Sequence, residues 1–392
     1  MKRFLASRFL RVAAFMAGVL GASGVATATD PYLIANDDQS GFILASVTFY
    51  NVSPDGLLTV KKRVGTSGNG ISGGFFGTNR VSVLNSAKNE CVYVSEAGSG
   101  TIVGIEISTL NASGSTTGST TDAGTSNGIG LAMNNQYLYA SFTDSNTIGT
   151  FSVQPGCQLT FLNDTPVAGL AGGVINSMGV HGNLLVATYT DGSIESFDLS
   201  GGTPLSNGDE QYSTATVRSQ GATYPNTIDI TKDGRFAIFG DTSTSLAVEV
   251  SHIVSGKLSK TVVYKTTASI SSSNVMLSPD ESLLYVANTQ GDAVTALFFN
   301  KATGKLSAGC TSGPLRGQSS RWSYLSGLAL MSQTGNGGGV YVAEFGNPSS
   351  IGIVHLTASG QTCTLQEDAK SPVSDLNSPG LLSIGSFPPR SF

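Results

Sequence analysis

The sequence has few charged residues and few prolines. Only 12% of the 392 residues are charged, about half the usual share, and 13 are proline. Long solvated helices depend on charged faces and charge pairs, so we do not expect a helical protein. Glycine is abundant instead, with 49 residues, and Ser and Thr are frequent. This composition favours an all-β protein with many turns and a large core.

Basic residues are especially scarce. Four of the 21 Lys and Arg residues lie in the first eleven positions, and the rest of the chain has 17 basic and 26 acidic residues. A net charge of about −9 disfavours nucleic acids and anionic membranes, because both demand basic surface. We therefore expect no nucleic-acid partner. The sequence also has no GxxxxGK segment of the kind that cradles phosphates.

The only long apolar run stands at the start of the chain. Basic residues precede a run over 12–25, and the small residues Ala26, Thr27 and Ala28 follow it. This pattern predicts a secretory signal peptide over 1–28, cut after Ala28. A membrane anchor is the alternative, but the run is short and interrupted by Gly and Ser. We expect a periplasmic or secreted protein without a membrane span, in which residues 29–392 form one domain.

Cysteine and histidine are rare, with four and three residues. There is no CxxC segment and no histidine close to a cysteine, so we predict neither a metal site nor a cofactor. An even number of cysteines in an exported protein favours two disulfides, for which three pairings are possible. The cysteines are Cys91, Cys157, Cys310 and Cys363.

One pattern of strands and turns recurs along the chain. Its most regular copy is "LSPDESLLYVANTQGDAVTALFFNKATGKLS" at 277–307. It predicts an apolar strand, a polar turn, an alternating strand, a Gly-containing hairpin and a shorter strand. Six similar copies occur, and equivalent positions in six of the seven are spaced by 46 to 56 residues. The other copies begin near residues 32, 91, 137, 184, 236 and 340.

A fourth strand completes each copy. A short apolar segment precedes six copies, whereas the first copy lacks one and a matching segment occurs at 378–386. Seven four-stranded antiparallel units at this period specify an all-β, seven-bladed β-propeller, with the C-terminal strand closing the ring in the N-terminal blade. Two sandwich domains would explain neither the period nor the displaced strand. We name the strands of each blade A to D from the channel outward.

The blade order restricts the cysteine pairing. Cys91 falls at the A–B turn of blade two and Cys157 at the C–D turn of blade three, and these turns open on the same face. Cys310 and Cys363 belong to the adjacent blades six and seven, although Cys310 lies nearer the opposite face. A bond between Cys157 and Cys363 would cross the ring. We therefore predict bonds 91–157 and 310–363.

The segments SPD, LYVAN and ATGKLS within 277–307 carry a family resemblance. They are similar to the lactonase-family seven-bladed propellers, the group of 6-phosphogluconolactonase and the carboxy-muconate lactonising enzymes. LYVAN also resembles the strand of YVTN-type repeat propellers. The resemblance extends over all seven blades, and its strongest motif lies in blade six. It implies a site at the top of the central channel that acts on a lactone or sugar acid.

The residues that match the family's catalytic motif are only partly present. In those enzymes a Pro-Arg-His stretch opens an inner strand, and a Glu ends a neighbouring strand. The matching stretch here is PNT at 225–227, while blade two offers Asn79-Arg80, with Arg80 at the histidine-equivalent position. Glu96 and Glu344 fall at strand-B ends, where the family often has an acid. The resemblance implies that Arg80 polarises a carbonyl and that Glu96 or Glu344 activates water.

Further polar residues fall in the loops at the same end of the predicted ring. The B–C loops carry an acid in every blade, yet such residues often only stabilise turns. Four arginines of the D–A loops either clamp a carboxylate or form local ion pairs. The acids are Asp37, Asp38, Glu96, Asp144, Asp191, Asp241, Asp292 and Glu344, and the arginines are Arg80, Arg218, Arg316 and Arg321. As substrate-binding residues we predict Asn79, Asn127, Asn226, Arg218, Arg321 and Trp322, the last by stacking on a sugar-like ligand.

Histidine does not contribute to this predicted site. His181 falls at an A–B turn, His252 in a C–D hairpin and His355 within a strand C, so a Ser/His/Asp triad is not expected.

Two functions remain. One is hydrolysis or isomerisation of a lactone or sugar acid, and the other is non-catalytic binding of a ligand, polysaccharide or protein partner. The family resemblance favours the first, and the lost Pro-Arg-His match favours the second. We expect a monomer in either case.

Overall fold

The computed structural model contains thirty β-strands and two 3-10 helices in the part of the chain that it describes. The predicted signal peptide over 1–28 lies outside that part. No helix within it is long and apolar enough to cross a membrane. The described residues are 31–37, 45–71, 79–86, 89–117, 128–213, 225–241, 247–265, 272–288, 291–317, 324–331, 338–346, 349–375 and 383–389.

The first three sheets each contain four antiparallel strands. Blade one contains β30 (Ser383–Phe387), β1 (Tyr32–Asn36), β2 (Ser46–Val52) and β3 (Leu58–Gly65). Blade two contains β4 (Val81–Asn85), β5 (Glu90–Glu96), η1 (Ala97–Ser99), β6 (Thr101–Glu106) and β7 (Asn111–Thr117). Blade three contains β8 (Ile129–Met133), β9 (Tyr137–Phe142), β10 (Thr147–Val153), η2 (Pro155–Cys157) and β11 (Leu159–Pro166).

The other four sheets follow the same order, and two of them have a divided outer strand. Blade four contains β12 (Ile175–His181), β13 (Leu184–Tyr189), β14 (Ser193–Asp198), β15 (Leu205–Ser206) and β16 (Gln211–Tyr212). Blade five contains β17 (Pro225–Ile230), β18 (Phe236–Asp241), β19 (Ala247–Val254) and β20 (Lys257–Lys265). Blade six contains β21 (Ser272–Leu277), β22 (Leu283–Asn288), β23 (Ala293–Asn300) and β24 (Lys305–Thr311). Blade seven contains β25 (Tyr324–Leu330), β26 (Gly339–Phe345), β27 (Ser349–Ser359), β28 (Thr362–Glu367) and β29 (Val373–Asp375).

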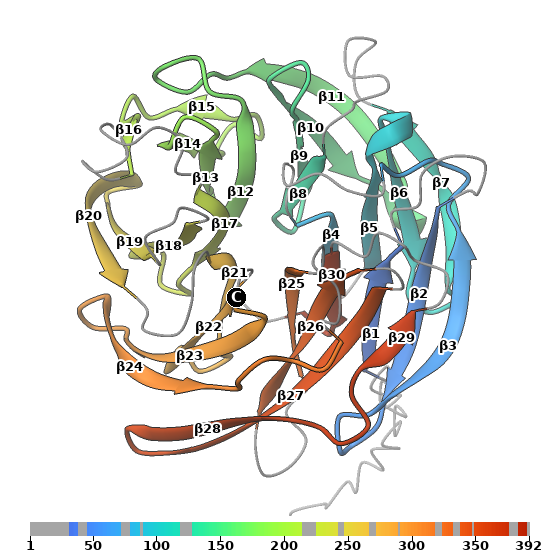
Figure 1. The fold of residues 1–392 in the computed structure, drawn as a ribbon. Helices are drawn as coiled ribbons and strands as arrows, with labels where there is room; N and C mark the ends of the chain where they lie inside the picture. The colour runs from blue at the N-terminus through green and yellow to red at the C-terminus, as the bar shows by residue number, and fades with distance from the viewer. Residues whose placement is uncertain are drawn as a thin grey trace, which may run out of the picture.

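The seven sheets form a closed ring, as the sequence predicts. Strand β30 pairs with β1 in an antiparallel register that sets Tyr32 opposite Phe387 and Asn36 opposite Ser383. The seven inner strands contact one another in the order β4, β8, β12, β17, β21, β25 and β30. In Figure 1 the red C-terminal strand accordingly lies beside the blue N-terminal blade. Pairing the two ends of the chain removes the free edges at which the ring would open.

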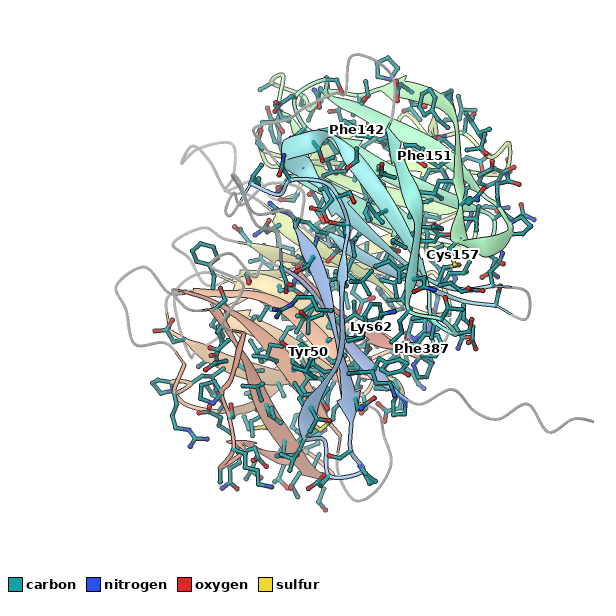
Figure 2. All side chains as sticks on the ribbon, turned by 90° about the vertical axis from the view of Figure 1, so that its right-hand side faces the viewer. Tyr50, Lys62, Phe142, Phe151, Cys157 and Phe387 are labelled. Carbon is teal, nitrogen blue, oxygen red and sulfur yellow. A yellow bond between two sulfur atoms is a disulfide. The ribbon has the colours of Figure 1, made fainter. Side chains whose placement is uncertain are left out.

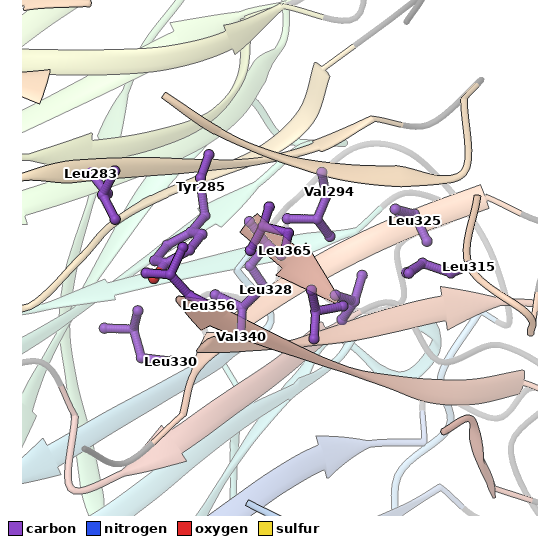
Figure 3. Packing of buried hydrophobic residues seen from close by; sticks show 14 residues of the cluster. Leu283, Tyr285, Val294, Leu315, Leu325, Leu328, Leu330, Val340, Leu356 and Leu365 are labelled. Atoms are coloured by element: carbon purple, nitrogen blue, oxygen red, sulfur yellow. The ribbon is translucent and has the colours of Figure 1, made fainter. Parts of the chain in front are cut away.

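Strand alternation directs successive side chains to the two neighbouring blades. In β26, Val340 and Val342 pack into the core between blades six and seven, whereas Tyr341 and Ala343 pack between blades seven and one. Figure 3 shows the first of these cores, with Leu283 and Tyr285 beside Val340 and Leu356. The hydrophobic core is therefore divided into layers between blades. A residue's position along a strand decides which of the two adjacent blades its side chain contacts.

Both predicted disulfides are present, and each connects two adjacent blades. Cys91 of β5 is bonded to Cys157 of η2, with a Cα–Cα distance of 5.6 Å. Figure 2 shows Cys157 with its yellow sulfur at the rim of blade three. Cys310 of β24 is bonded to Cys363 of β28, also with a Cα–Cα distance of 5.6 Å. Both residues of the second pair lie on outer strands, so they meet even though Cys310 was expected nearer the opposite face.

Tyrosine side chains connect other pairs of blades. Tyr139 of β9 donates a hydrogen bond to Gly202 O of blade four at 3.0 Å, and Tyr341 of β26 donates to Gly56 O of blade one at 2.8 Å. Tyr93 occupies the equivalent place in blade two, but its buried hydroxyl has no hydrogen-bond partner among the described residues. Blades two and three are connected by the Cys91–Cys157 bond instead.

These equivalent tyrosines offer a matched pair of substitutions. Tyr341→Phe is expected to lower the free energy of unfolding by about 1 kcal/mol, because the Gly56 carbonyl loses its buried donor. Tyr93→Phe removes a buried hydroxyl that makes no hydrogen bond in the described part of the chain, so we expect no loss. Denaturant unfolding of both variants measures the difference, and equal losses would contradict the assignment.

The outer strands differ from the shorter strand that the sequence predicts after the hairpin of each copy. Five of them, β3, β7, β11, β20 and β24, have seven to nine residues. A register shift interrupts the pairing of strands C and D in each of these blades. Such bulges increase the twist and let the outer strand follow the widening rim. In blade four, Asp209 interrupts the outer strand by accepting hydrogen bonds from Ser196 N–H at 3.0 Å and from Leu258 N–H of blade five at 2.5 Å.

Candidate functional site

Polar side chains gather at the end of the ring where the A strands begin and the B strands end; we call it the BC/DA end. Carboxylates stand at or beside the end of strand B in four blades, and all four are buried. The acids are Asp37, Glu96, Asp241 and Glu344, with exposures of 0%, 0%, 3% and 1%. An ionised carboxylate is costly in such surroundings unless it is neutralised, hydrogen-bonded or protonated.

Arg80 and Glu96 are close along blade two but point to opposite sides of its sheet. The Arg80 carbonyl accepts a hydrogen bond from Ser95 N–H at 3.1 Å, which pairs these two residues across the strands. Ser95 faces blade three, where its hydroxyl donates to Ile129 O at 2.6 Å. Glu96 follows Ser95 and therefore faces blade one, where Gly68 lies against its side chain. Arg80 itself is almost wholly buried, with 2% exposure.

Two of the asparagines predicted to bind substrate, Asn79 and Asn226, form hydrogen bonds with neighbouring blades. Asn79 has a positive φ of 61° and its carbonyl accepts a hydrogen bond from Leu131 N–H of blade three at 3.0 Å. Asn226 sits at a bulge between β17 and β18 and accepts a 3.4 Å hydrogen bond from Asn176 of blade four. Both asparagines lie at the BC/DA end, and their role in substrate binding stays a prediction. Asn127, Arg218, Arg321 and Trp322 lie outside the described residues.

Glu344 lies in the layer between blades six and seven. One carboxylate oxygen accepts a hydrogen bond from Ser350 Oγ, and Oε1 has no hydrogen-bond partner among the described residues. Burial raises the pKa of Glu344 to about 7; the Ser350 hydrogen bond and the charge of Arg316 lower it, while Glu367 and Asp292 raise it. A carboxyl with a pKa near neutrality can take up and release a proton at physiological pH.

Two glycines from different segments make room for the Glu344 carboxylate. A Cβ atom on Gly317, in the loop that follows β24, would lie 1.6 Å from Oε2. A Cβ atom on Gly352, opposite Val342 in β27, would lie 2.7 Å from Oε1. Any larger side chain at either position would displace the carboxylate. The burial of Glu344 thus depends on glycine at both positions.

The buried carboxylate of Asp37, unlike that of Glu344, has a cation beside it in the described part of the chain. It occupies a similar place in blade one and accepts hydrogen bonds from the hydroxyls of Ser46 and Thr48. Arg63 also lies beside it, with Nε 3.5 Å from Oδ2. Arg316, whose charge lowers the pKa of Glu344, pairs instead with Glu367 at 3.2 Å. Of these two carboxylates, only Asp37 has a cation in contact, so Glu344 is the better candidate for proton transfer.

Some acids of the B–C loops have local roles, as the turn interpretation anticipates. Asp191 accepts hydrogen bonds from Ala171 N–H at 2.7 Å, Gly173 N–H at 3.2 Å and Ser193 N–H at 2.9 Å. These contacts hold the loop before β12 against blade four. Together with its hydroxyl contact to Ser193, they keep the pKa of Asp191 below its usual value despite partial burial. Asp191 therefore stabilises loop structure.

Sequence reasoning missed Glu249 in β19. It is 1% exposed and its Oε2 has no hydrogen-bond partner in the described part of the chain. Burial raises its pKa to about 8, with a further increase from Asp241 of the neighbouring strand and a decrease from the Ser213 hydroxyl. The signal was present in the segment "AVEVS" (247–251), where an acid interrupts an apolar alternation. Only the fold shows that both faces of this strand are buried.

Glu249 is expected to make stability fall with rising pH. Its pKa in the folded state is about 8, above the ordinary value of 4.5, so the folded protein holds this proton more tightly than the unfolded chain. The contribution is complete below pH 4.5 and is lost between pH 4.5 and 8, by at most ~1.4 kcal/mol per pH unit. Glu249→Gln should flatten the decline of the melting temperature over this range. An unchanged slope in this variant would refute this assignment.

The three histidines lie away from the BC/DA end. His181 ends β12 at the A–B turn, where Gly234 lies against its ring, and His252 contacts Phe236 edge-to-face at 4.9 Å between centroids. His355 in β27 pairs with Asp368 through Nε2 at 2.9 Å. Among the described residues, no cluster of His, Cys, Asp and Glu could hold a metal ion.

These features define a seven-bladed propeller with buried carboxylates and a buried arginine at one end of the ring. The family model described as "Lactonase, 7-bladed beta-propeller" matches residues 91–373, which is more than two thirds of the chain. The protein therefore belongs to the seven-bladed lactonase family. A comparison with curated proteins finds no match.

Solved structures with the same fold have little sequence identity to this chain. A candidate 6-phosphogluconolactonase from Bacteroides fragilis has a TM-score of 0.64 at 15% identity, over 92% of this chain and 99% of that one. The periplasmic gluconolactonase of Pseudomonas aeruginosa has a TM-score of 0.55 at 14% identity, over 71% of this chain and 80% of that one. A protein of unknown function from Desulfotomaculum acetoxidans has a TM-score of 0.62 at 14% identity, over 90% and 98%. At such identities these similarities establish the fold alone.

Proposed function

We propose that the protein hydrolyses or isomerises a lactone or sugar acid at the BC/DA end of its ring. Membership of the lactonase family and the likeness to gluconolactonase structures support this substrate class. The observation that carries the proposal is Glu344, a buried carboxyl group without a cation in contact among the described residues and with a pKa of about 7. A group of this kind is suited to general base catalysis.

In the hydrolytic reaction, Glu344 accepts a proton from water as the water oxygen adds to the lactone carbonyl carbon. The negative charge develops on the carbonyl oxygen, where the Arg80 guanidinium stabilises it. The ring C–O bond then breaks, and the leaving alkoxide takes the proton to give a hydroxy acid. Glu96, in the same blade as Arg80, is the alternative base. The backbone N–H of Arg80 donates to Ser383 Oγ of blade one at 3.0 Å, and blade one lies between blades two and seven.

The direct test is an assay of the purified protein against a panel of sugar lactones, including gluconolactone and 6-phosphogluconolactone. We expect turnover above the spontaneous rate for at least one of them. No turnover on any lactone would refute the catalytic proposal. Saturable binding of a lactone without turnover would instead support a protein that binds its ligand at this end.

We further propose that the protein acts outside the cytoplasm. The basic and apolar pattern over 1–28 supports this location, and so do the two disulfides, since such bonds persist in oxidising compartments. Fractionation of cells that express the full-length chain tests the location, and recovery of the intact chain in the cytoplasm would contradict it.

A further inference from the structure

Five basic residues gather at the end of the ring opposite the candidate site, where the A–B turns and C–D hairpins lie. All belong to blades five and six, and we call them the basic patch. Four are exposed and Lys232 is half-buried. Only two exposed acids, Asp233 and Asp280, lie in the same turns. The basic patch consists of Lys232, Arg235, Lys257, Lys301 and Lys305.

Contacts between the two blades hold the basic patch together as one surface. Arg235 donates from Nη2 to Lys301 O in the blade-six hairpin at 2.7 Å, and its guanidinium lies over the Phe236 ring. The Lys232 N–H donates to Glu281 Oε1 of blade six at 2.6 Å. Gly304, with a φ of 68°, packs directly on the Phe236 ring. The turn of blade five is therefore fixed against the turn and hairpin of blade six.

Three ammonium groups of the patch are not used within the protein. In the described part of the chain, Nζ of Lys232, Lys301 and Lys305 forms neither a hydrogen bond nor an ion pair. The neighbouring acids are already occupied: Asp233 pairs with Arg235 at 2.7 Å, and Asp280 accepts hydrogen bonds from Ser278 and Ser282. Elsewhere, Arg63 and Arg316 contact carboxylates of their own. The positive charge of the patch is thus available to an external group.

The surroundings of the patch indicate the kind of partner. Val254 is 60% exposed and pairs with Lys257 in the blade-five hairpin, so an aliphatic side chain stands beside one of the cations, whose Nζ donates to Asn207 O of blade four at 2.7 Å. The aromatic ring nearest to Arg235, Phe236, is buried and cannot stack on a sugar. A cationic surface bordered by an exposed aliphatic residue fits a segment that carries carboxylates together with apolar side chains. We propose that the basic patch binds an acidic polypeptide segment.

Binding of short fluorescein-labelled poly-glutamate, measured by fluorescence anisotropy, tests this proposal. We expect saturable binding at ~0.05 M NaCl that weakens strongly at ~0.5 M, because salt screens exposed charges. The double variant Lys301→Glu/Lys305→Glu should weaken the affinity by roughly tenfold or more. Both lysines are exposed on a hairpin, so the substitution leaves the core intact.

A second double variant provides the control at equal net charge. Lys61→Glu/Lys370→Glu reverses two exposed lysines on blades one and seven, and it should retain affinity within about threefold. Equal losses of affinity in both variants would show a general charge effect and overturn the proposal that the basic patch is the binding site. Absence of saturable binding to the unchanged protein would also overturn it. Tighter binding of polygalacturonate or polyphosphate than of poly-glutamate would refute the assignment to an acidic polypeptide.

Discussion

Replacing Glu344 with glutamine is expected to lower lactone turnover by about 10²–10⁴-fold, because a general base contributes that much to a proton transfer. Glutamine has the same shape and can still accept the Ser350 hydrogen bond, so the space left by Gly317 and Gly352 remains filled. It cannot accept a proton. The loss should therefore appear in kcat, with the melting temperature unchanged or raised, since burial already disfavours the charged form of Glu344.

The pH dependence of this variant separates Glu344 from Glu96. If the Glu344 carboxylate is the base, wild-type kcat/KM should rise with pH and level off above about 7, as this carboxyl loses its proton. Glu344→Gln removes that rise, whereas Glu96→Gln retains it. Arg80→Ala should lower the rate without moving the midpoint. A midpoint that persists in Glu344→Gln and disappears in Glu96→Gln would assign the base to blade two.

Removing the Cys91–Cys157 bond is expected to cost ~4 kcal/mol of unfolding free energy, from the 66-residue separation that it closes. In a chain of this size, the corresponding fall in melting temperature is about 5 °C. Alanine is the suitable replacement at both positions, because both cysteines are fully buried and serine would add an unpaired hydroxyl. Thermal unfolding of Cys91→Ala/Cys157→Ala, followed by circular dichroism, measures the effect.

The second disulfide serves as the matched control. Cys310 and Cys363 enclose a similar separation of 53 residues, but they lie on outer strands and are only partly buried. Blades six and seven also remain connected by Arg316, which pairs with Glu367. In contrast, Cys91 and Cys157 are fully buried in the core between blades two and three, so their replacement also removes core contacts. We therefore expect the smaller loss for Cys310→Ala/Cys363→Ala, and a larger one would contradict this account.

The blade architecture was predictable because its signals are local and repeated. Turn residues such as Asp280 and Gly304 and apolar strands such as β22 recur at a nearly constant period, so the seven units can be recognised one by one. The closing strand was predictable because the first copy lacks the strand that precedes the other six, and the segment 378–386 supplies a matching one. The disulfide pairs followed from the same order, because neighbouring copies in sequence are neighbours in the ring.

The site depended on contacts that no local pattern contains. Arg80 and Glu96 belong to paired strands, yet their positions in the alternation direct them to different neighbouring blades. Burial raises the pKa of Glu344, and Gly317 from the loop after β24 lies against its carboxylate. Glu249 resembled an ordinary strand acid until the fold showed it buried beside Asp241.

By itself, the sequence determined the blades, their closure and the partners of the cysteines, because strand periodicity and turn chemistry act between residues near in the chain. Only the tertiary structure decided which carboxylates are buried away from water and which have a cation in contact. Burial and electrostatic interaction are sums over all neighbours in space, and in a propeller the decisive neighbours come from the adjacent blade.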